Sequence, residues 1–124
     1  MADILHKDES YYIIGLCMEI HNELGKGFSE AVYGDALELE LKSHGVPFNR
    51  EVRFPIDYKG QILKHQYIAD FVLDNKIILE LKAIQKLNNA HTKQTLNYLA
   101  ASKLRLGILI NFGEDSLTYK RVVL

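Results

Sequence analysis

Three charged side chains interrupt two short apolar segments of the kind that form buried strands. Asp70 lies inside YIADFVL (residues 67–73), and Glu80 and Lys82 lie inside IILELKA (residues 77–83). A buried carboxylate is costly unless it is paired, hydrogen-bonded or bound to a metal. Two carboxylates offer the oxygen ligands that Mg²⁺ or Mn²⁺ prefers, and such an ion polarises a phosphoryl oxygen and activates a bound water. A neighbouring lysine can orient that water or stabilise charge that develops on phosphorus.

The same residues also have a purely structural interpretation. A carboxylate and a lysine form ordinary pairs at solvated strand ends, and the E-x-K triplet alone leaves both interpretations open. In a generic α/β domain with a buried ion pair, Glu80 and Lys82 would contact only each other.

The two segments are predicted to be strands of one hairpin, and the length of its turn decides whether the carboxylates meet. A two-residue turn would set Asp70 opposite Leu79. A three-residue turn would pair Leu73 with Ile77 and set Asp70 opposite Glu80. A slip of one residue moves every side chain to the other face, so only one of these registers brings the two carboxylates together.

We predict the three-residue turn for two reasons. Side chains alternate along a strand, so Glu80 and Lys82 share a face about 6–7 Å apart, and this register adds the aspartate to them. It also leaves Asn75 free to adopt the left-handed conformation that asparagine tolerates.

The wider chain resembles a known family through three groups of residues. Asp70 followed by Glu80-Leu81-Lys82 resembles the D…E-x-K core of the PD-(D/E)xK nuclease superfamily, and GFSEAVY (residues 27–33) matches the G-x-x-E-x-x-Y signature of one small family within it. His91, Gln94 and Tyr98 are similar to the H-x-x-Q-x-x-x-Y helix that follows this core. The resemblance spans roughly residues 10–112 and implies a restriction-endonuclease-like α/β core with a mixed sheet.

The resemblance also implies a function and a set of site residues. The function is hydrolysis of phosphodiester bonds by a metal-dependent nuclease with Mg²⁺ (or Mn²⁺), acting on nucleic acid, and on DNA more than RNA. The implied metal ligands are Asp70, Glu80 and the backbone carbonyl of Leu81; the implied catalytic residues are Lys82, Glu30 and Gln94; and the implied supporting residues are Tyr33, His91, Tyr98 and His21.

Several of these residues have simpler alternatives. Glu30 is either a further metal ligand or water-positioning acid, or a first-turn acid stabilised by the helix dipole. His21 is expected to cap or pack, and His91 is equally a surface residue at the edge of its helix. The alternative function is a catalytically silent nuclease-fold module that binds nucleic acid or a protein partner.

Composition bounds these possibilities. The 124 residues (1–124) are expected to form a single domain, and the formal charge of −1 means that any nucleic-acid contact must come from a local patch. The lone Cys17 excludes a disulfide framework and is expected in the core. Neither a signal-peptide pattern nor an apolar run of membrane-spanning length is present, so we expect a cytoplasmic protein without a membrane partner. A homodimer is one expected state, because cutting both strands of a duplex often needs two copies.

The remaining pattern predicts the elements that position the site. We expect helices over residues 10–24, 30–44 and 86–102, and strands over 48–58, 61–73, 76–83, 104–111 and 117–123, in the order α-α-β-β-β-α-β-β. Gly25 is the expected stop of the first helix and Ser29 the expected N-cap of the second. The apolar stripe predicted for the last helix contains Leu87, Ala90, Gln94, Tyr98 and Ala101.

Overall fold

The computed structural model describes residues 5–124 and contains the predicted elements in the predicted order. They are α1 (Lys7–Leu24), α2 (Glu30–Ser43), β1 (Phe48–Tyr58), β2 (Gln61–Leu73), β3 (Ile77–Lys82), α3 (Asn89–Ser102), β4 (Leu106–Asn111) and β5 (Thr118–Val123). The element ends differ from the predicted ends by at most three residues. The expected α/β fold with a mixed sheet is therefore confirmed.

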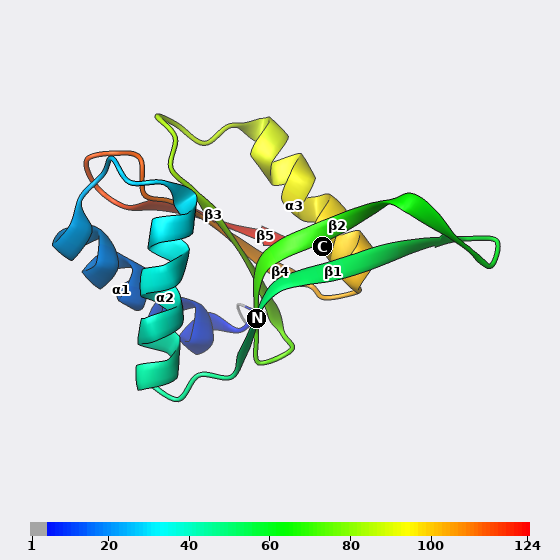
Figure 1. The fold of residues 1–124 in the computed structure, drawn as a ribbon, viewed down its shortest axis with the longest axis horizontal. Coiled ribbons are helices and arrows are strands. Elements are labelled where there is room, and N and C mark those ends of the chain that lie inside the picture. The colour runs from blue at the N-terminus through cyan, green and yellow to red at the C-terminus, as the bar shows by residue number, and fades with distance from the viewer. Residues whose placement is uncertain (1–4) are drawn as a thin grey trace, which may run out of the picture.

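One five-stranded sheet lies between two layers of helices (Figure 1). Its order is β1-β2-β3-β4-β5, and neighbours are antiparallel except β3 and β4, which are parallel and connected through α3. Helices α1 and α2 cover one face and α3 covers the other, and each layer encloses its own apolar core. None of the helices within residues 5–124 is long and apolar enough to cross a membrane.

The core between the sheet and the first two helices is the larger one. The face of β3 that carries Leu79 and Leu81 packs there against Tyr33 and Leu37 of α2, all of them nearly inaccessible to solvent. Cys17 of α1 is fully buried in the same core, as the sequence predicts, and burial raises its pKa to about 12.

The predicted register of the hairpin is confirmed. Leu73 pairs with Ile77 and Phe71 pairs with Leu79, so the same register places Asp70 next to Glu80. The turn has the predicted three residues, 74–76, and Asp74 as well as Asn75 adopts a left-handed conformation, with φ of 49° and 54°. Lys76 N donates to Leu73 O at 2.9 Å and closes the turn.

Helix α3 differs from its prediction at both its start and its buried face. It begins at Asn89, because the side chain of Asn88 accepts hydrogen bonds from the Ala90 and His91 amides and so caps the helix. The buried residues are Thr95, Tyr98 and Leu99, whereas Ala90 and Gln94 are exposed. The stripe predicted through Ala90 and Gln94 is therefore wrong by about one residue of rotation, and this leaves Gln94 at the edge of the helix.

A local break in the β1–β2 ladder changes which side chains face which core. Phe48 packs in the core of α1 and α2, but Val52 and Phe54 of the same strand pack in the core of α3. These residues are separated by even numbers of positions, so a regular strand would place their side chains on one face of the sheet. Glu51, with a left-handed φ of 56°, lies where the ladder skips a pair, and β2 changes face at the same level, between Ala69 and Phe71.

Candidate active site

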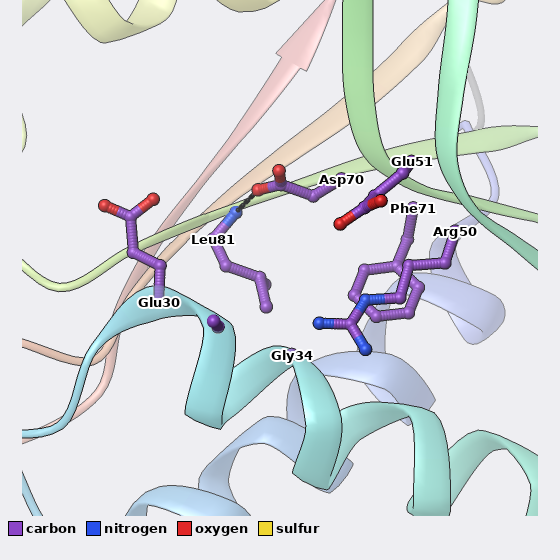
Figure 2. Close-up of a pocket in the computed structure, with 8 residues that line it drawn as sticks. Glu30, Gly34, Arg50, Glu51, Asp70, Phe71 and Leu81 are labelled. Atoms are coloured by element: carbon purple, nitrogen blue, oxygen red, sulfur yellow. Dashed lines mark hydrogen bonds between the residues drawn. The ribbon is translucent and has the colours of Figure 1, made fainter.

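The site begins where β2 and β3 separate. Their pairing ends at Phe71 and Leu79, and the next side chain of β2, Asp70, occupies the gap. The Leu81 amide donates to Oδ2 of Asp70 at 2.7 Å (Figure 2). This bond to a side chain takes the place of a backbone hydrogen bond between β2 and β3. The aspartate is therefore fixed on the sheet by the strand that carries the second carboxylate.

Glu80 is a buried carboxyl group with an oxygen that lacks a hydrogen-bond partner. Its side chain is 4% exposed, and Oε1 is buried with no hydrogen-bond partner. Burial, and then the adjacent Asp70 carboxylate, raise the pKa of Glu80 to about 10. A carboxyl group in this state is held neutral at physiological pH unless a positive charge is supplied.

Lys82 lies on the same side of the sheet and reaches α3. Its Nζ donates to Oε1 of Gln94 at 3.4 Å, and Glu80 lies beside Asp70 rather than beside the lysine alone. The structural interpretation in which Glu80 and Lys82 contact only each other is therefore wrong. The predicted association of Gln94 with the lysine is observed, although Gln94 is exposed rather than part of a buried stripe.

Tyr98 closes the α3 side of the two carboxylates. It is 8% exposed, and its ring meets Tyr67 edge to face at 5.1 Å between centroids. Burial, followed by the charges of Glu80 and Asp70, raises its pKa to about 12. Tyr98 is therefore a neutral hydroxyl near both acids at physiological pH.

Glu30 approaches Asp70 from the opposite side of the sheet. A pocket of about 190 Å³ lies between α2 and the β1–β2 hairpin, and Figure 2 shows Glu30, Glu51 and Asp70 around it. Within residues 5–124 no three acidic, histidine or cysteine side chains are close enough together to hold one metal ion. In this geometry Glu30 faces the pocket and does not form a group of three with Asp70 and Glu80.

Two residues of this pocket carry no signal in the sequence that we recognised. Glu51 enters it through its left-handed backbone, which a glutamate rarely adopts. Arg50 lies over the Phe71 ring and donates to Asp35 at 2.8 Å. A Cβ on Gly34 would lie 2.5 Å from the guanidinium, so this glycine makes room for the arginine.

Tyr33 explains the spacing between the glycine loop and Glu30. Its fully buried hydroxyl donates to Gly25 O at 2.5 Å and accepts from the Phe28 amide, and its ring stacks on Phe112 at 4.3 Å. The tyrosine thus anchors the loop before α2 and fixes where Glu30 begins the helix. Ser29 occupies the N-cap position, but its side chain makes no capping bond.

The two candidate histidines have structural contacts. His21 is buried, and its Nε2 lies 2.9 Å from Glu114 O, which agrees with the expected packing role. His91 Nδ1 accepts from the Asn88 amide and completes the cap of α3. In this structure His91 therefore belongs to the cap of α3.

A sequence model of the PD-(D/E)XK nuclease superfamily matches residues 7–122. The chain belongs to this superfamily. No curated protein gives a comparable match. The fold agrees with that of solved structures: SSO0001 superposes with a TM-score of 0.61 over 75% of this chain at 22% identity, and the chain spans 48% of its length. The alkaline exonuclease LHK-Exo from Laribacter hongkongensis gives a TM-score of 0.52 over 99% of this chain and 72% of its own, at 13% identity.

In this member of the nuclease superfamily, Asn111 at the end of β4 holds the segment that follows Lys82. Its side chain is fully buried, accepts from the Ile84 amide at 3.0 Å and donates to Ile84 O at 2.9 Å. The next turn passes so close that a Cβ on Gly113 would lie 2.2 Å from the same carbonyl. Asn111 is not among the residues predicted for the site; its signal in the sequence is a single amide at the end of an otherwise apolar strand.

We expect Asn111→Ala to lower the free energy of unfolding by about 2 kcal/mol, because it leaves both backbone groups of Ile84 buried without their partner. Urea titration followed by circular dichroism measures this. The matched control is Asn97→Ala at an exposed position of α3, which should change stability by less than about 0.5 kcal/mol. Equal effects of the two substitutions would contradict a role for Asn111 in holding this segment.

Proposed function

We propose that the protein is a metal-dependent nuclease that hydrolyses phosphodiester bonds. One observation carries this: the buried carboxyl of Glu80 has an unpartnered oxygen beside the Asp70 carboxylate, with Lys82 on the same face of the sheet. The two adjacent carboxyl groups cannot both be ionised in the metal-free protein, so together they do not add to its stability. A cation held by both groups would allow both to be ionised.

The side chains fit a hard divalent cation. Asp70 and Glu80 supply carboxylate oxygens and Leu81 a backbone carbonyl, and such oxygen donors suit Mg²⁺ or Mn²⁺. Nucleases of this superfamily generally use divalent metals, and the identity of the ion here is part of our proposal. When bound, the ion polarises a phosphoryl oxygen and lowers the pKa of its water.

The remaining residues act on the substrate and on the attacking water. Lys82 holds that water through Nζ and offsets negative charge on the phosphoryl oxygens, and its contact with Gln94 fixes where the ammonium lies. Glu30 faces the pocket from the start of α2 and orients water there. These roles are proposals that rest on position and chemistry.

Within the superfamily we propose membership of the G-x-x-E-x-x-Y family. The structure gives that spacing a physical reason, because Tyr33 binds the glycine loop and thereby sets the position of Glu30. DNA is the preferred substrate in this proposal, and a second copy of the chain serves the second strand of a duplex. A cytoplasmic location and an organisation as one domain also stay predictions.

The proposal is tested by cleavage of labelled single-stranded DNA, duplex DNA and RNA in Mg²⁺ or Mn²⁺. We expect cutting that EDTA abolishes and that Glu80→Ala lowers at least about a thousandfold, because removing the group costs the protein its metal site. Glu23→Ala, at an exposed position of α1, is the control. Binding without cutting in any metal would instead support the silent module.

A further inference from the structure

The β1–β2 hairpin extends far beyond the sheet to which it belongs. Figure 1 shows its tip well outside the layer formed by α3 and the other strands. We call residues 53–66 the arm. The last hairpin side chains that pack on a core are Phe54 and Tyr67, and every residue from 57 to 66 is exposed. Most of the arm is therefore not needed to bury apolar surface.

The arm is nevertheless an ordered ladder. Arg53 pairs with Ile68, and Tyr58 pairs with Gln61 next to the tip. Left-handed conformations at Lys59 and Gly60 form the turn, and Asp57 Oδ1 accepts from the Gly60 amide at 2.8 Å. The strands shift register between Pro55 and Asp57, and such a bulge twists the ribbon and discourages edge-to-edge pairing.

Positive charge is concentrated on this arm. It carries Arg53, Lys59 and Lys64 against the single acid Asp57, a formal +2 in a chain whose total is −1. All three cations are exposed, and the one acid accepts a hydrogen bond within the turn. Tyr58 is 55% exposed, and Lys59 lies 5.4 Å from the centre of its ring. Exposed cations next to an aromatic ring suit a backbone of phosphates with accessible bases.

The arm also leads directly to the candidate active site. β2 runs from the tip to Asp70, and at 3.3 Å per residue the nine steps from Gln61 span roughly 30 Å. On β1 the arm is followed toward the core by Glu51, which lines the pocket with Asp70. A strand lying along the arm therefore passes into the region of the two carboxylates.

We infer that the arm is a phosphate-binding element that holds a nucleic-acid strand along the path to the carboxyl groups of Asp70 and Glu80. This inference deepens the proposed function and rests on it for the direction of the path. The arm supplies the local positive patch that a chain of net negative charge needs to hold a polyanion.

The test is the affinity of fluorescently labelled single-stranded and duplex oligonucleotides, measured by anisotropy in EDTA so that no cutting occurs. The variant is Lys59→Gln with Lys64→Gln. We expect about tenfold weaker binding at 100 mM salt, and a plot of log K against log salt whose slope is smaller by about 1.8 for a duplex, the equivalent of two phosphate contacts.

The matched control is Lys42→Gln with Lys120→Gln. It removes the same charge, but from α2 and from β5 at the opposite edge of the sheet, both exposed. The control should keep the wild-type slope. Circular dichroism melts of all variants establish that they are folded.

Equal losses in the two double variants, or a wild-type affinity in the arm variant, would overturn the inference. So would a dimer that Ile62→Ser with Leu63→Ser dissociates while oligonucleotide affinity stays unchanged, because the arm would then bind a second copy. Binding through the arm without cleavage in any metal would count against the nuclease proposal alone. Cleavage with no dependence of affinity on the arm would count against the arm alone.

Discussion

Lys82→Met is expected to lower the single-turnover rate of cleavage by about a thousandfold while Mn²⁺ affinity stays near that of the wild type. Methionine keeps the apolar stem of the side chain but removes the ammonium that contacts Gln94. The carboxylates that would hold the ion remain in place. Single-turnover cleavage of a labelled oligonucleotide measures the chemical step, and calorimetry with Mn²⁺ measures the metal site.

The matched control is Lys86→Met, four residues farther along the chain and exposed. It removes the same charge near the site, so a similar loss there would show that general attraction of the substrate accounts for the effect. A Lys82→Met protein that cuts within about threefold of the wild-type rate would remove the lysine from the chemistry.

Glu80→Gln is expected to stabilise the metal-free protein, and to do so more as pH rises. The pKa of Glu80 is raised from 4.5 to about 10 in the folded state, so the unfolded chain ionises first. Below pH 4.5 the group is protonated in both states and costs nothing. Above it, wild-type stability falls by about 1.4 kcal/mol per pH unit until the folded group also ionises near pH 10. Glutamine is free of this loss, so we expect a gain of about 3 kcal/mol at pH 7.

Urea titrations of both proteins in EDTA between pH 4 and 9 measure this difference, with Glu23→Gln as an exposed control. Mn²⁺ should then narrow the difference at pH 7, because it stabilises only the protein that binds it, by about 1.4 kcal/mol at ten times the dissociation constant. A difference between wild type and Glu80→Gln that does not change with pH would contradict the burial of an unpaired carboxyl group. An equal response of both proteins to Mn²⁺ would contradict its role as a ligand.

Periodicity was sufficient to predict the elements, and the register of the hairpin followed from the two carboxylates together with the turn residue Asn75. The charged positions of β3 alternate with apolar ones, and one register alone brought Asp70 to Glu80. Apolar positions, charge and turn residues in this segment all favour the same answer, which is the condition under which a sequence specifies its structure strongly. Helix α1 was predicted for the same reason, since its apolar face and the stop at Gly25 both indicate the same helix.

Other parts of the site depend on features that the sequence does not display. The start and the buried face of α3 were both misjudged: Asn88 caps the helix later than expected, and Thr95 rather than Gln94 is buried. Glu51 enters the pocket through a left-handed backbone that its residue type disfavours, so only tertiary structure reveals it. Asn111 is distant in sequence from the Ile84 backbone groups that it satisfies.

The parallel pairing of β3 with β4 has a consequence for the order in which the molecule assembles. Hairpins such as β2–β3 and β4–β5 close short loops, but β3 meets β4 only after residues 83–105 have folded back. Closing a long loop costs conformational entropy before the stabilising contacts form, so non-local parallel pairing is slow. Glu80 is thus enclosed late, when the chain is already compact. The acids are neighbours along a local hairpin from the beginning, but the shielded environment that makes them chemically unusual arises only with the complete sheet.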